Sequence, residues 1–115
     1  MWEILLVEDD ISLSKTIKLI IEIEWHNVHL TNSLSWAIKI MSNKTFEILV
    51  TDTELFWTHK NLDWIKVAEE FKKHNPKWKI IWMSAIDRPE WKWNCDIFLL
   101  KSWIWNKLIN FLNKL

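Results

Sequence analysis

The chain has 115 residues, half of them hydrophobic, and its 15 basic residues balance its 15 acidic residues. This length fits one domain with a substantial core, and the balanced charge argues against a nucleic-acid or membrane-surface protein. A single cysteine excludes an internal disulfide and a cysteine-rich zinc site. No signal peptide or membrane span is recognisable, so we expect one cytoplasmic domain over residues 1–115.

Five segments have the composition of β-strands, and four of them are nearly continuous apolar runs of the kind buried on both faces of a sheet. In chain order the segments are residues 2–7, 26–30, 46–52, 77–85 and 96–101. The second segment, "HNVHL", is shorter and alternates between apolar and polar residues. The other four segments predict strands of a parallel sheet that are buried on both faces.

Between these strand segments, and after the last one, apolar residues recur at helical intervals. It predicts helices within residues 11–25, 33–44, 61–75 and 104–115. Asp10 and Ser33 stand where N-caps are expected, and Asn75-Pro76 ends the third helix. Strands that alternate with helices indicate an α/β fold, a doubly wound parallel sheet with helices on both faces.

The connection between the last two strands is unusually short. Only residues 86–95 separate them, whereas a crossover between parallel strands needs about a dozen residues including its helix. We therefore expect a shortened fourth helix of one or two turns in this segment.

Polar residues of complementary chemistry end four of the predicted strands. Glu8, Asp9 and Asp10 follow the first strand, Asp52 ends the third, Ser84 the fourth and Lys101 the fifth. The carboxyl ends of parallel strands form the ligand-binding edge of such folds. Carboxylates that meet there repel one another unless a cation lies between them, and oxygen ligands favour Mg²⁺. A carboxylate beside Mg²⁺ can attack phosphorus, and a lysine and a serine suit the phosphoryl oxygens.

The motifs "ILLVEDD", "ILVTD", "IIWMSA" and "FLLK" together resemble the strand-end motifs of the response regulator receiver domain, in order and spacing along essentially the whole chain. This resemblance implies a flavodoxin-like sheet of strand order 2-1-3-4-5. It also implies a site with Asp52 as phosphoacceptor, Glu8 and Asp9 as further Mg²⁺ ligands, Ser84 and Lys101 as phosphoryl-binding residues, and Ser84 and Phe98 as switch residues.

The function implied by the resemblance is signalling through a two-component phosphorelay. A sensor histidine kinase or a histidine phosphotransfer protein would phosphorylate Asp52. No output domain is recognisable in the sequence, so the signal is expected to pass by contact with an unknown output protein, without nucleic acid or membrane. Such a domain helps to catalyse its own phosphorylation and dephosphorylation, but we class it as a signalling domain and not as an enzyme.

Two alternatives remain open. A pseudo-receiver is a protein-interaction module of the same fold that is not phosphorylated. It is favoured by the shortened fourth helix, by Ser102, which replaces the family's usual proline, and by the altered loop at residues 56–62. The retained set of Asp52, Ser84 and Lys101 opposes it. A phosphohydrolase similar to the haloacid dehalogenases would want an aspartate at position 54, where this chain has glutamate, and more length for a cap domain.

The chain contains no glycine and eleven tryptophans. Ordinary domains use glycine at left-handed turns and helix ends, and a glycine at position 25, 57, 64 or 82 would restore sequences typical of the family. The other tryptophans are neutral or slightly improved by the same exchange. We therefore hypothesise that the tryptophans stand at UGA codons that mean glycine in the source organism, as in some bacterial lineages. The glycine version is predicted to be more stable.

Overall fold

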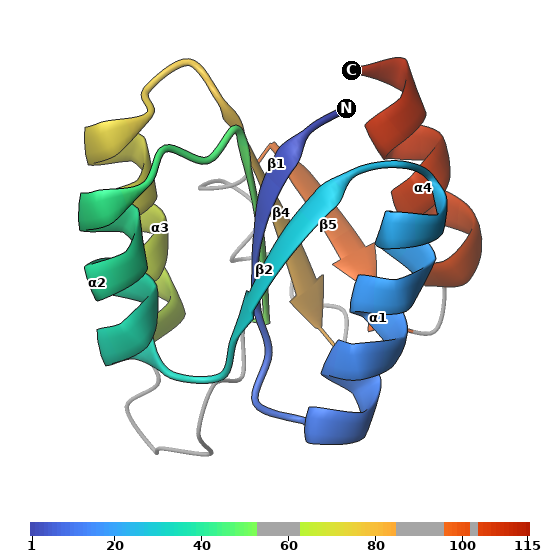
Figure 1. Cartoon of the computed structure of the whole chain (residues 1–115), viewed down its shortest axis with the longest axis horizontal. Helices are drawn as coiled ribbons and strands as arrows, with labels where there is room; N and C mark the ends of the chain where they lie inside the picture. Colours follow the sequence, from blue (N-terminus) through green and yellow to red (C-terminus); the bar gives the residue numbers. More distant parts are fainter. Residues whose placement is uncertain (53–62, 85–95, 102–103) are drawn as a thin grey trace.

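The computed structural model describes residues 1–52, 63–84, 96–101 and 104–115. Five parallel strands form one sheet in the order β2-β1-β3-β4-β5, with helices on both faces (Figure 1). In chain order the elements are β1 (Glu3–Val7), α1 (Ile11–Ile23), β2 (Asn27–Thr31), α2 (Leu34–Asn43), β3 (Ile48–Asp52), α3 (Asp63–His74), β4 (Lys79–Ser84), β5 (Ile97–Leu100) and α4 (Ile104–Lys114). The predicted flavodoxin-like α/β fold and its strand order are confirmed.

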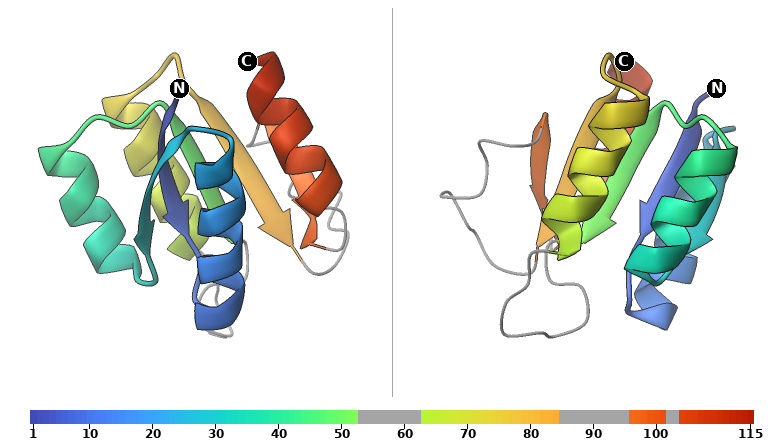
Figure 2. Two further views of the ribbon diagram at one scale, coloured as in Figure 1. Left: turned by 45° about the vertical axis from the view of Figure 1, so that its right-hand side comes forward. Right: turned by 90° about the vertical axis from the view of Figure 1, so that its left-hand side faces the viewer.

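The helices divide into two pairs, one on each face of the sheet. Helices α1 and α4 cover one face and α2 and α3 the other (Figures 1 and 2). Each pair closes its own hydrophobic cluster, because successive side chains of a strand point to opposite faces. Leu5, Leu49 and Trp82 pack beneath α2 and α3, whereas Ile4 and Val50 pack beneath α1 and α4. The central strands are therefore apolar on both faces, as the unbroken apolar runs predict.

The predicted helix starts are also found. The Asp10 side chain accepts a hydrogen bond from the backbone N–H of Leu13 at 3.0 Å, and the Ser33 hydroxyl accepts one from Trp36 at 3.1 Å. These bonds satisfy N–H groups that have no partner within their own helix. Helix α3 ends at His74, directly before Asn75-Pro76. Local sequence thus determines where three of the helices begin or end.

All five strands begin one or two residues later than the sequence predicts. Strand β2 covers residues 27–31 and not 26–30, because Asn27 is the register partner of Glu3. His26 is buried, and its Nδ1 accepts a hydrogen bond from the backbone N–H of Trp2 at 3.0 Å. Strand β3 begins at Ile48, two residues later than predicted.

The end of α1 shows how the chain manages without glycine. Trp25, two residues beyond the helix, has a φ angle of 69°, the left-handed conformation in which helices commonly end on glycine. Its N–H donates to the carbonyl of Glu22 at 3.0 Å, while 84% of the residue is exposed. Tryptophan thus occupies a backbone conformation that glycine adopts without steric cost.

Several sequence-based expectations lie outside the described residues. They include the shortened fourth helix in residues 86–95, the loop around Phe56 and the peptide bond at Ser102. Within the described residues, none of the helices combines the length and the apolarity that crossing a membrane requires.

Candidate functional site

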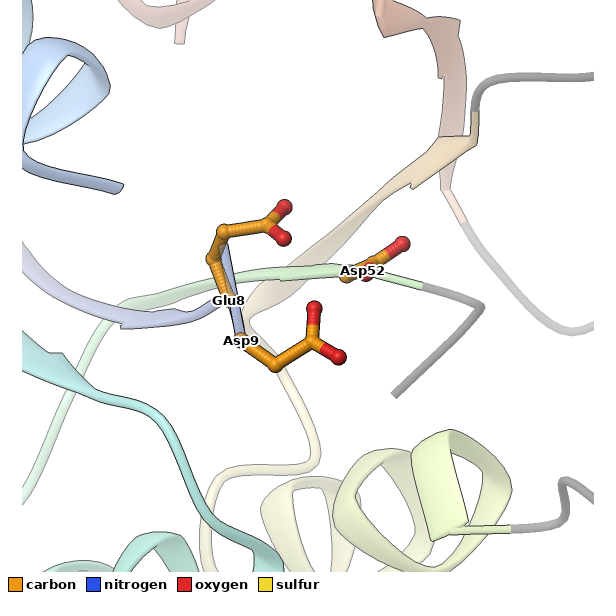
Figure 3. Close-up of side chains that lie close together, drawn as sticks. All are labelled: Glu8, Asp9 and Asp52. Atoms are coloured by element: carbon orange, nitrogen blue, oxygen red, sulfur yellow. The ribbon is translucent and has the colours of Figure 1, made fainter. Parts of the chain in front are cut away.

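Three carboxylates from two neighbouring strands meet at the carboxyl edge of the sheet. Glu8 and Asp9 directly follow β1, and Asp52 is the last residue of β3. One oxygen of each lies within 4.8 Å of the others, and Figure 3 shows the three side chains gathered at this point. Strands β1 and β3 flank the place where the strand order reverses, which is where folds of this class bind ligands.

Glu8 is buried and hydrogen-bonded at the end of β1. Its side chain is fully buried, its backbone N–H donates to the carbonyl of Thr31 at 3.1 Å, and its Oε1 accepts the N–H of Asp10 at 3.1 Å. Burial, reinforced by the charge of Asp52, raises the pKa of Glu8 to about 8, although Lys101 acts in the opposite direction. A second positive charge placed among these carboxylates would favour the ionised form of Glu8.

Lys101 supplies the positive charge in this structure. It follows β5 directly, and its Nζ lies 3.1 Å from Glu8 Oε2 and 3.3 Å from Asp52 Oδ1. Burial alone would lower the pKa of Lys101, but the charges of Asp52 and Glu8 outweigh that effect and raise it. The residue predicted from the resemblance as a phosphoryl partner therefore already touches the predicted acceptor.

Ser84 and Phe98 lie on the face of the sheet that α2 and α3 cover. Ser84 ends β4 and is fully buried, one residue beyond Met83, the register partner of Asp52. Alternation along β4 directs Ser84 to the same face as Trp82, on the side of α2 and α3. Phe98 pairs with Trp82 across the ladder and packs on that face. The two predicted switch residues thus share the face of the sheet that α2 and α3 cover.

Asp10, the third acid of the first motif, has a different task. Its carboxylate caps α1 and is not part of the cluster of Glu8, Asp9 and Asp52. Lys101 and Glu8 were expected at the same edge of the sheet, but their direct contact was not specified by the sequence, because 93 positions separate the two residues and the strand register sets their distance.

The donor chemistry of the cluster fits a hard divalent cation. All three residues contribute carboxylate oxygens, which Mg²⁺ and similar ions prefer over nitrogen or sulfur ligands. A doubly wound α/β domain with an acidic site at the switch point of its sheet is the class of protein that these features define.

Comparison with known proteins identifies the family. The model of the response regulator receiver domain matches residues 4–104, and the chain belongs to this family, a group of signalling domains of two-component systems. A search of curated proteins finds no match.

Solved structures of similar fold come from several organisms. A response regulator protein from Thermotoga maritima, in complex with Mg²⁺ and BeF, superposes with a TM-score of 0.83 at 22% identity, over 99% of this chain and 98% of that one. A response regulator receiver protein from Sinorhizobium medicae gives 0.85 at 24% identity, over 98% and 92%. A receiver domain protein from Clostridium thermocellum gives 0.81 at 20% identity, over 99% and 93%.

Proposed function

We propose that residues 1–115 form a single receiver domain that accepts a phosphoryl group on Asp52 from the phosphohistidine of a sensor histidine kinase or a histidine phosphotransfer protein. One observation carries the proposal. The Asp52 carboxylate lies within 4.8 Å of ligand atoms of Glu8 and Asp9 and 3.3 Å from the Lys101 ammonium. A nucleophile, further oxygen donors and a cation therefore meet at one point.

The chemistry that fits this arrangement is displacement at phosphorus. An oxygen of Asp52 forms a bond to phosphorus, the bond from phosphorus to the donor's imidazole nitrogen breaks, and that nitrogen retains the electron pair. Glu8, Asp9 and Asp52 would hold Mg²⁺, which when bound offsets the charge of the carboxylates and of the phosphoryl oxygens. Lys101 Nζ, already 3.3 Å from Asp52 Oδ1, is placed to bind one of those oxygens.

Ser84 and Phe98 are proposed to convert phosphorylation into a change of surface. Ser84 is the last residue of β4, next to the site, Phe98 lies in β5, and both face the side of α2 and α3. A phosphoryl group on Asp52 would attract the Ser84 hydroxyl and bias a two-state equilibrium of this region. The partner that responds to this change is an output protein. Phosphoryl transfer and the contact with the output protein take place in the cytoplasm.

The proposed function is tested by incubating the chain with acetyl phosphate and Mg²⁺ and measuring its intact mass. We expect one added phosphoryl group, its complete loss in Asp52→Asn, and its retention in Asp10→Asn, since Asp10 caps α1 outside the cluster. An unmodified chain, also after all tryptophans are replaced by glycine, would overturn the proposal and favour a pseudo-receiver that signals without phosphorylation.

We also propose that the eleven tryptophans are encoded by UGA and stand for glycine in the source organism. The conformation of Trp25, with φ at 69° and the side chain 84% exposed, supports this proposal. Reading the nucleotide sequence decides it, because eleven UGG codons would contradict it. Thermal unfolding of both chains is an independent measurement, and the glycine version is expected to melt at the higher temperature.

A further inference from the structure

The amino-terminal end of β5 is fastened to β4 by one residue, Asp96. Its backbone N–H donates to the carbonyl of Ile80 at 3.0 Å, and its Oδ2 accepts the N–H of the same Ile80 at 2.8 Å. Asp96 therefore satisfies both backbone groups of Ile80, one with its main chain and one with its side chain. A residue whose side chain has no acceptor could make only the bond from its backbone N–H to the carbonyl of Ile80.

Two lysines surround the Asp96 carboxylate. Lys72 Nζ, at the end of α3, lies 3.4 Å from Oδ2, and Lys79 Nζ, at the start of β4, lies 3.8 Å from Oδ1. Lys72 also donates to the carbonyl of Trp78 at 2.6 Å. These side chains are substantially exposed, so the ion pairs themselves contribute little. The hydrogen bond to Ile80 is the interaction that fixes the strand end.

Strand β5 needs such a fixed point. It has four residues and lies at the edge of the sheet, where β4 is its neighbouring strand. A shift by one residue would turn Phe98 to the wrong face, so the apolar pattern itself opposes it. A shift by two residues, or detachment of the strand end, preserves that pattern. An anchor at a fixed position opposes those movements in addition to the ladder with β4.

A movement of β5 would displace Lys101 from the acidic site. Lys101 is the residue after β5, and its Nζ lies only 3.1 Å from Glu8 and 3.3 Å from Asp52. Each residue of displacement along a strand is about 3.3 Å, as large as these contacts. Fastening the start of the strand therefore determines whether the lysine at its end reaches the carboxylates.

We propose that Asp96 is a positioning residue for Lys101: it holds β5 in register on β4 and so keeps the Lys101 ammonium between Glu8 and Asp52. The consequence for phosphorylation rests on the proposed function. The effect on the placement of Lys101 does not rest on it.

The proposal is tested first with two variants of Asp96 in the full chain. Asp96→Ala removes the acceptor for Ile80, whereas Asp96→Asn keeps an oxygen there and removes only the charge. We expect phosphoryl uptake from acetyl phosphate to be about tenfold slower in Asp96→Ala, the size of one lost hydrogen bond, and close to the unaltered rate in Asp96→Asn. Glu22→Ala, which removes an exposed ion pair with Lys18 on α1, is the matched control and should change nothing.

A double-mutant cycle separates positioning from a general structural role. When Lys101→Ala is already present, Asp96→Ala should slow uptake no further, because the group that it positions is gone. Equal slowing in both backgrounds would overturn the proposal. Loss of the folded state in Asp96→Ala, seen by circular dichroism, would also overturn it, since Asp96 would then support the whole sheet and not one strand end.

A nuclear Overhauser contact between the Lys101 methylenes and the β-protons of Asp52 provides a measurement without phosphate. It should be present in the unaltered chain, lost in Asp96→Ala and recovered in Asp96→Asn. Persistence of the contact in Asp96→Ala overturns the positioning role. If the contact behaves as expected while no chain takes up phosphate, the positioning role stands and the proposed function fails.

Discussion

The two ends of β1 carry glutamates in opposite electrostatic situations. Glu3, at the first position of the strand, accepts a hydrogen bond from Asn27 Nδ2 at 2.7 Å and pairs with Lys44 Nζ at 3.2 Å. The bond from Asn27 and, after it, Lys44 lower the pKa of Glu3 in spite of some burial. At the other end, burial and Asp52 raise the pKa of Glu8 to about 8.

This contrast separates an edge that holds the sheet together from an edge that is prepared for a ligand. At the amino edge each of the carboxylates of Glu3, Glu47 and Asp96 accepts a backbone or side-chain N–H. At the carboxyl edge three carboxylates crowd together with one lysine. Carboxylates with strongly shifted pKa values are characteristic of functional sites. We therefore expect proton release and ligand binding to change the charge of the carboxyl edge.

The largest expected effect is the contribution of Glu8 to the pH dependence of folding stability, measured in buffer with a chelator. A carboxyl group whose pKa is about 8 in the folded chain and about 4.5 in the unfolded chain favours the folded state below pH 4.5. That advantage is lost as the pH rises toward 8, because the unfolded chain releases its proton first. Glutamine at position 8 cannot release a proton. Between about pH 4.5 and pH 8 the free energy of unfolding of Glu8→Gln should therefore rise by a few kcal/mol relative to that of the unaltered chain, measured by urea unfolding.

Mg²⁺ is the control for this measurement. A metal that requires ionised ligands binds more strongly at high pH, so Mg²⁺ should stabilise the unaltered chain more at pH 8 than at pH 5 and should act weakly on Glu8→Gln. Parallel stability curves for the two chains without metal would show that Glu8 titrates normally, and the contrast between the two ends of β1 would disappear.

A smaller effect is expected at Trp25, on the amino edge between α1 and β2. Replacing Trp25 by glycine removes the steric cost of a φ angle of 69°, about 1 kcal/mol, and should raise the melting temperature. Trp36→Gly is the matched control. Trp36 is also exposed, at 56%, but lies in the first turn of α2 beneath Lys39. In a helix, glycine should cost up to about 1 kcal/mol, which replaces the neutral effect expected for Trp36 from the sequence. Stabilisation by both exchanges would refute the conformational explanation.

Much of this fold could be predicted from the residues because its determinants are local. Apolar runs locate the strands, and Asp10 and Ser33 locate two helix starts, because each acts on backbone groups a few positions away. The left-handed residue at position 25 was indicated by the absence of glycine. The strand order, in contrast, came from the resemblance to a family, since periodicity says nothing about which strands are neighbours.

The parts that could not be predicted are contacts across the sheet. Lys101 was expected near Asp52, but its contact with Glu8 depends on the register of four strands. The bonds from Asp96 to Ile80 and from Trp2 to His26 join segments 16 and 24 positions apart. An aspartate before a strand and a histidine before another are common surface residues, and nothing local marks them as anchors.

His26 gives the next prediction, again on the amino edge. Burial, and then the charge of the N-terminal amino group, lower the pKa of His26 below its ordinary value. Below about pH 6.5 the unfolded chain therefore binds a proton before the folded chain does, and stability falls as the pH decreases. His26→Asn keeps an acceptor for the Trp2 N–H without titrating, so its stability should fall less between pH 7 and pH 5. An equal fall in both chains, measured by urea unfolding, would assign the pH dependence to other groups.

The smallest effect is expected for Glu3→Gln. Glutamine retains an oxygen for the Asn27 amide and loses only the charge opposite Lys44, a partly exposed pair, so the cost at pH 7 should be at most about 1 kcal/mol. Because the pKa of Glu3 is lowered by folding, this contribution is present above about pH 4.5 and is lost as the pH falls through the folded-state pKa. Glu8→Gln should change stability in the opposite direction as the pH rises. The same sign for both exchanges in chelated buffer would mean that the two ends of β1 do not differ in the way their contacts indicate.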